Sequence, residues 1–62
     1  MTPQFKLISS NNIDRFEERM NDFFGNLSAH EVIVDMKFAT TALANSIEYS
    51  VLIHYQTTAA WE

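Results

Sequence analysis

Residues 13–27, which read IDRFEERMNDFFGNL, carry the strongest secondary-structure signal in this chain. Their apolar side chains recur every three or four residues, which places them on one face of a helix. Asn11 and Asn12 come just before this stretch, and the side-chain oxygen of either one can accept from the free amides of a first turn. Gly25 stands where a left-handed residue commonly ends a helix. The pattern predicts a helix over about residues 12–25 with an apolar stripe made of Ile13, Phe16, Met20, Phe23, Phe24 and Leu27.

Three further segments alternate between apolar and polar residues, which is typical of strands. They span residues 4–9, 32–39 and 47–56, and the last two are joined by residues 40–46. The order β-α-β-β predicts one α+β domain over residues 1–62, a three-stranded sheet with one helix packed on one face. The last strand is the longest and most apolar, so we place it in the centre of the sheet.

The alternation also predicts which side chains face the helix, because successive residues of a strand point to opposite faces. The covered face takes the more apolar set. That set is Phe5, Leu7, Val32, Val34, Met36, Phe38, Ile47, Tyr49, Val51, Ile53 and Tyr55. The open face then carries Lys6, Ile8, Ile33, Asp35, Lys37, Glu48, Ser50, Leu52, His54 and Gln56.

The open face carries three aliphatic side chains, Ile8, Ile33 and Leu52. This makes it too apolar for a purely solvated face and too polar for a core. One interpretation is an antiparallel sheet with one wet face. The other is an interface between two copies, face to face or edge to edge. Chains this small often depend on disulfides, a metal or oligomerisation, and this one has no cysteine. We therefore predict a homodimer or a larger oligomer whose interface includes Ile8, Ile33, Leu52 and His54.

The composition disfavours several classes of protein. Four Lys and Arg against eight Asp and Glu give a net charge of −4, which disfavours direct binding to nucleic acid. The sequence has no apolar run long enough for a membrane span. The first ten residues lack the apolar core of a signal peptide, so a cytoplasmic location is expected.

A few polar residues of the open face allow catalytic or metal chemistry in principle. His54 beside Asp35 or Glu48 would be a proton-transfer pair, although a surface or interface histidine fits as well. Asp35 with Glu48 would suit a divalent cation, whereas Lys37 beside them favours an ion-pair network. There is no glycine-rich phosphate loop and no nucleophile elbow. We therefore predict a protein that is not an enzyme and has no catalytic residue, metal or cofactor.

Three runs of the sequence resemble a known family. They are residues 22–24 with Leu27, residues 34–38 (VDMKF) and residues 49–55 (YSVLIHY). Together they resemble the small Cse-type sporulation proteins, named for their control by sigma E, which have relatives in phages and mobile elements. The resemblance spans nearly the whole chain and implies the same order of elements, and it brings no activity with it.

Two functions from different classes follow as hypotheses. The first is a non-enzymatic, homo-oligomeric accessory protein that acts by binding another protein. The alternative is a phage or mobile-element counter-defence protein that mimics nucleic acid or sequesters a nucleotide signal between its subunits. A sequestering site needs cations, and the candidate ligand or partner contacts are Lys6 and Lys37, with Arg15 or Arg19 beside them.

Overall fold

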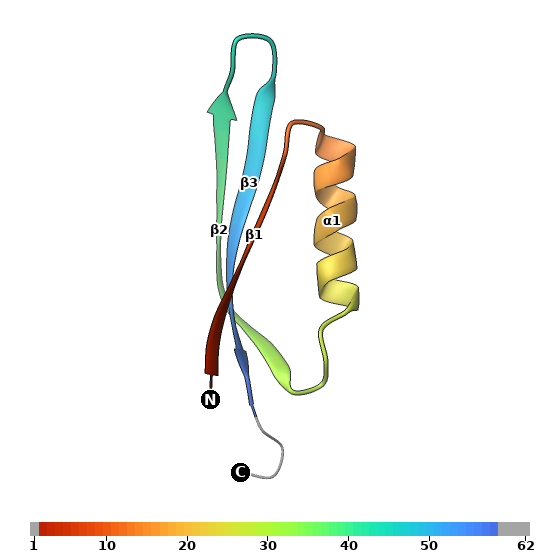
Figure 1. Cartoon of the computed structure of the whole chain (residues 1–62), viewed down its shortest axis with the longest axis vertical. Coiled ribbons are helices and arrows are strands. Elements are labelled where there is room, and N and C mark those ends of the chain that lie inside the picture. The colour runs from red at the N-terminus through yellow and green to blue at the C-terminus, as the bar shows by residue number, and fades with distance from the viewer. Residues whose placement is uncertain (1, 59–62) are drawn as a thin grey trace.

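The computed structural model describes residues 2–58, which form three strands and one helix (Figure 1). In chain order they are β1 (Thr2–Ser10), α1 (Ile13–Gly25), β2 (Glu31–Ala42) and β3 (Ile47–Thr57). The sheet is antiparallel in the order β1-β3-β2. The predicted β-α-β-β architecture and the central position of β3 are confirmed. The strands run further than predicted, so that only residues 43–46 remain to connect β2 to β3.

The helix begins as predicted and ends differently. Asn12 is the N-cap, and its side-chain oxygen accepts from the backbone N–H of Arg15 at 3.0 Å. The expected left-handed Gly25 is wrong, since no residue in the described part of the chain has a positive φ. Instead Asn26 closes the last turn, its backbone N–H and its side-chain amide both donating to the carbonyl oxygen of Asp22. The Asn26 N–H also donates to the Phe23 carbonyl and the Leu27 N–H to the Phe24 carbonyl, so the last turn is closed without a left-handed residue.

The core lies between α1 and the β1–β3 side of the sheet. Its buried members are Ile8, Phe16, Val51 and Ile53. Partly buried side chains of the helix stripe and of β3 pack around them, namely Met20, Phe23, Phe24, Tyr49 and Tyr55. The predicted helix stripe and the predicted inner face of β3 are thus confirmed in their central parts, whereas Ile13 and Ile47 at their ends are exposed.

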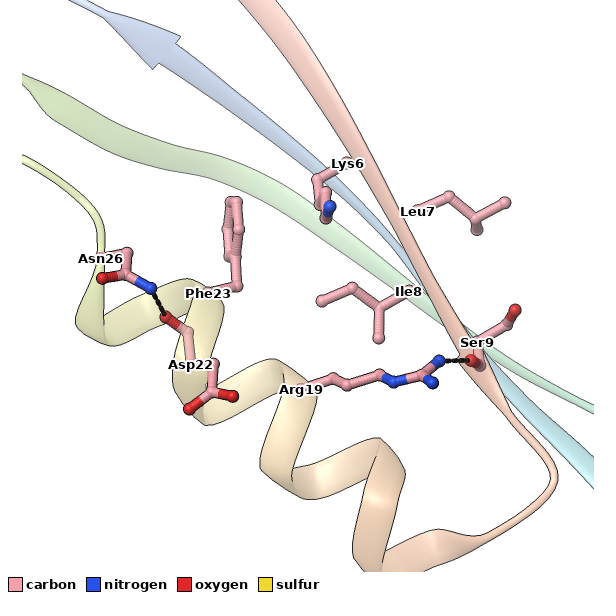
Figure 2. A pocket seen from close by; sticks show the side chains of 8 residues that line it. All are labelled: Lys6, Leu7, Ile8, Ser9, Arg19, Asp22, Phe23 and Asn26. Atoms are coloured by element: carbon pink, nitrogen blue, oxygen red, sulfur yellow. Dashed lines mark hydrogen bonds between the residues drawn. The ribbon is translucent and has the colours of Figure 1, made fainter.

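The predicted faces of β1 are wrong. Ile8 pairs with Val51 and is buried beneath the helix, whereas Leu7 pairs with Leu52 on the open face. Figure 2 shows Lys6 and Ile8 on the helix side of β1 and Leu7 on the opposite side. The physical reason is that Leu7 and Ile8 are adjacent aliphatics, so either phase of the strand offers an apolar residue to the core.

A bulge overturns part of the prediction for β2. The register with β3 shifts between Ile33 and Asp35, which makes Val34 an extra residue. An extra residue moves the alternation by one position. Val32 therefore shares the open face, and Ile33 lies on the helix side, contrary to the predicted open-face position. From Asp35 onward the residues keep their predicted faces.

The molecule is thin and elongated. Its extents are 50 × 17 × 10 Å, and its radius of gyration is 13.8 Å. A compact domain of the same length would have about 11 Å. The helix lies over β1 and β3, and the β2–β3 hairpin extends beyond its N-terminal end (Figure 1). On the described residues, no helix is long and apolar enough to cross a membrane.

Candidate functional site

The open face of the sheet carries an apolar patch, which we call the open-face cluster: Phe5, Leu7 and Leu52. Phe5 and Leu7 are each about two-thirds exposed, at 64% and 65%, and Leu7 lies directly opposite Leu52. Of the four predicted interface residues, Leu52 and His54 do lie on this face. Ile8 and Ile33 do not, so the patch is built largely from residues that the sequence pattern placed in the core.

His54 packs as an aromatic ring. It stacks on Phe5 with ring centroids 4.7 Å apart and an interplanar angle of 19°. Its Nε2 atom is buried and makes no hydrogen bond to the described residues. Asp35 is its neighbour on β2, but the Asp35 carboxylate is engaged by Lys37. The arrangement therefore does not form the proton-transfer pair considered from the sequence.

Asp35 and Lys37 form an exposed ion pair on the same face, with Lys37 Nζ 3.3 Å from Asp35 Oδ2. Glu48 lies far from them, because it pairs with Thr41 whereas Asp35 pairs with His54. These two positions are six residues apart along β3, or roughly 20 Å at the usual strand rise. The Asp35–Glu48 pair that was considered as a cation site is therefore not formed, and the described residues contain no group of three possible metal ligands.

A groove of about 540 Å³ runs between α1 and β1 (Figure 2). Two of the cations proposed for anion binding, Lys6 and Arg19, line it together. Asp22 lies in the same lining, and Arg19 Nη1 already donates to the Ser9 carbonyl oxygen at 2.9 Å. Lys37 belongs to the opposite face. The remaining lining residues are Leu7, Ile8, Phe23 and Asn26.

The outer edge of β2 is the most open part of the sheet. Eleven of its twelve residues are exposed and only Glu31 is half-buried. Met36 and Phe38 lie on the helix side but remain 46% and 60% exposed, because α1 packs over β1 and β3 and reaches Phe38 through the edge of its contact area, the Phe16 ring 5.9 Å away between centroids. The predicted strand order already made β2 an outer strand. The alternation gave no sign of how little the helix would cover it.

Comparisons of this chain with protein-family models, with curated proteins and with solved structures give no match. The resemblance to the Cse-type proteins therefore stays a prediction.

Proposed function

We propose that this protein is a small non-enzymatic module that self-associates and acts through protein–protein contacts. The observation that carries the proposal is the distribution of its apolar side chains. Only four hydrophobic residues of the described chain are buried, whereas eleven large ones are exposed. Isolated exposed apolar residues are ordinary, but adjoining ones are typical of interaction surfaces. Here they adjoin along β2 and in the open-face cluster.

The energetics of so small a core favour the same proposal. The described residues bury only four side chains. Domains of this size are usually stabilised by disulfides, a metal or oligomerisation in addition to such a core. Contact between copies would bury more of the exposed apolar surface and so stabilise the fold.

The polar residues also support a non-enzymatic role. A general acid or base needs a hydrogen-bonded partner that orients it and tunes its proton affinity. His54 faces the ring of Phe5, and Asp35 is engaged by Lys37. The resemblance to the Cse-type proteins adds a setting to the proposal, a cytoplasmic accessory protein of sporulation or of a related mobile element.

Sequestration of a nucleotide signal has less support. It would use Lys6 and Arg19 of the groove, but Asp22 offsets their charge and Arg19 is bonded to the chain itself. Titration of the parent with a nucleotide separates the two functions. Micromolar binding that is lost in Lys6→Gln would favour sequestration over a purely protein-binding role.

Sedimentation equilibrium tests self-association. We expect the parent, whose chain mass is 7.2 kDa, to sediment at twice that mass or more between micromolar and millimolar concentration. Glu18→Gln, on the exposed side of α1, is the matched control and keeps the mass of the parent. A parent that stays at the mass of one chain over this range contradicts the proposal.

A further inference from the structure

We infer that the partner of β2 is β2 of a second copy, paired edge to edge and antiparallel about a twofold axis at Met36. The inference rests on the proposed self-association and names its surface. An axis perpendicular to the sheet is the one that makes such a contact isologous. It would join two three-stranded sheets into one of six strands with both helices on the same face.

The two outer strands differ in how well they can accept another strand. β1 contains Pro3, which has no N–H to donate to a neighbour. Arg19 of the helix also bonds the Ser9 carbonyl, so a cation of the same chain lies against this strand. β2 has twelve residues and no proline. A long exposed edge with apolar side chains is a template for pairing with another chain, and only β2 fits that description among the described strands.

Charge selects the register. A twofold axis through Asp35 would place the Asp35 carboxylates of the two copies directly opposite each other. An axis through Lys37 would do the same with the two Lys37 ammonium groups. Like charges at directly opposite positions destabilise a strand pair. An axis through Phe38 would place Lys37 opposite Ala39 and give neither charge a partner in the second copy. An axis through Met36 sets Asp35 of each copy opposite Lys37 of the other. Both side chains lie on the open face, where the pairs can form.

The apolar residues fit the same register. On the helix side, Met36 meets Met36 of the second copy. With the bulge counted as one position, Ile33 meets Phe38 of the second copy, and on the open face Val32 meets Ala39. Ile33, Met36 and Phe38 are exposed apolar residues on the helix side of β2, and Val32 is one on the open face. One register thus gives partners to the charges and to the apolar side chains together.

A charge-swap experiment tests the pairing. Asp35→Lys and Lys37→Glu each set like charges opposite at two symmetry-related positions. We expect each variant to self-associate at least tenfold more weakly than the parent. When the two variants are mixed, the lysine introduced at position 35 lies opposite the glutamate introduced at position 37, so a heterodimer regains both ion pairs. Native mass spectrometry distinguishes heterodimer from homodimers, since the variants differ in mass.

The matched control is Glu18→Lys mixed with Arg15→Glu. These changes alter the net charge by the same amounts, but both residues are on the exposed side of α1. We expect no preference for their heterodimer. The ion pair within one chain cannot explain a preference for heterodimers, because both partners of that pair belong to the same copy.

The outcomes separate the two proposals. A selective heterodimer of the β2 variants, with none for the helix variants, supports edge pairing. A parent that self-associates while both β2 variants associate as tightly as it does overturns edge pairing and leaves self-association intact. A parent that is a monomer throughout overturns self-association itself. Asp35 and Lys37 are 54% and 78% exposed, so the fold is expected to survive both changes, and circular dichroism checks this.

Discussion

β1 and β2 both border β3, but the helix covers β1 and leaves β2 largely exposed. β1 contributes Ile8 to the core and lies beneath α1 (Figure 1). β2 contributes no buried residue, although Met36 and Phe38 are as apolar as anything in β1. The chain covers one flank of its sheet with its own helix and leaves the other flank exposed.

Connection lengths explain the difference. Only residues 11 and 12 link β1 to α1, so the helix must return along the strand that it follows. A helix of 13 residues is about 20 Å long, whereas a strand of 12 residues spans about 40 Å. One short helix tied to β1 covers β1 and part of β3, and in the described residues its Phe16 ring beside Phe38 is where it meets β2.

The largest effect is expected from the core of the covered flank. Phe16→Ala should lower the free energy of unfolding by about 3–5 kcal/mol, because Phe16 is 3% exposed and a cavity would remain. Phe38→Ala removes the same ring from β2, 5.9 Å away between centroids but mostly exposed in a single chain, and should cost about 1 kcal/mol at a protein concentration at which the chain is a monomer. Urea unfolding measures both. Equal losses would show that the two flanks are equally packed.

A second pair of variants tests the corrected faces of β1. Ile8→Ala should lower the stability by about 2–4 kcal/mol, since Ile8 is buried against Val51. Leu7→Ala, the neighbouring residue on the open face, should change it by about 0.5 kcal/mol. The same urea titration applies, and the opposite ranking would restore the faces that simple alternation predicts.

A smaller effect on stability is expected from the hydrogen bond between Arg19 and the Ser9 carbonyl at the edge of β1. Arg19→Ala removes the bond to the Ser9 carbonyl and should cost about 0.5–1 kcal/mol, because the bond is exposed to solvent. Arg15→Ala, on the same helix without such a bond to β1, is the control and should be close to neutral. If thermal unfolding shows the two variants to be alike, the Arg19 contact does not distinguish β1 from β2.

The faces of the helix and of β3 could be predicted from sequence because each of these elements has one apolar face and one polar face. The residues around Phe16 in the helix and around Val51 and Ile53 in β3 can therefore face the core in one way only. In β1 the adjacent Leu7 and Ile8 offer an aliphatic side chain to the core in either phase, and the structure uses Ile8 although Phe5 and Leu7 make the other phase more apolar. In β2 the run of residues 32–34 is Val-Ile-Val, so a bulge shifts the register without placing a polar residue in the core.

Some features of the candidate site could be predicted from the alternation of residues within a strand, and others depend on how the strands are connected. Asp35 and Lys37 are two residues apart in a strand and therefore share a face, and the structure shows them in contact. The open-face positions of Leu52 and His54 follow from the confirmed phase of β3. The distance between Asp35 and Glu48 could not be predicted, because it depends on the length of the β2–β3 connection, which is shorter than the pattern indicated.

The smallest effect is expected from Leu52, the one predicted interface aliphatic that lies on the open face. It belongs to β3, so pairing through the β2 edge leaves it outside the contact. Leu52→Ser should change the dissociation constant by less than about threefold, against at least tenfold for Asp35→Lys. Serine is chosen because a new charge would disturb Lys37, its neighbour on β2. Sedimentation equilibrium on both variants compares them directly. If Leu52→Ser dissociates the oligomer and Asp35→Lys does not, copies meet through their open faces, and the exposed flank of β2 is then free for a different protein.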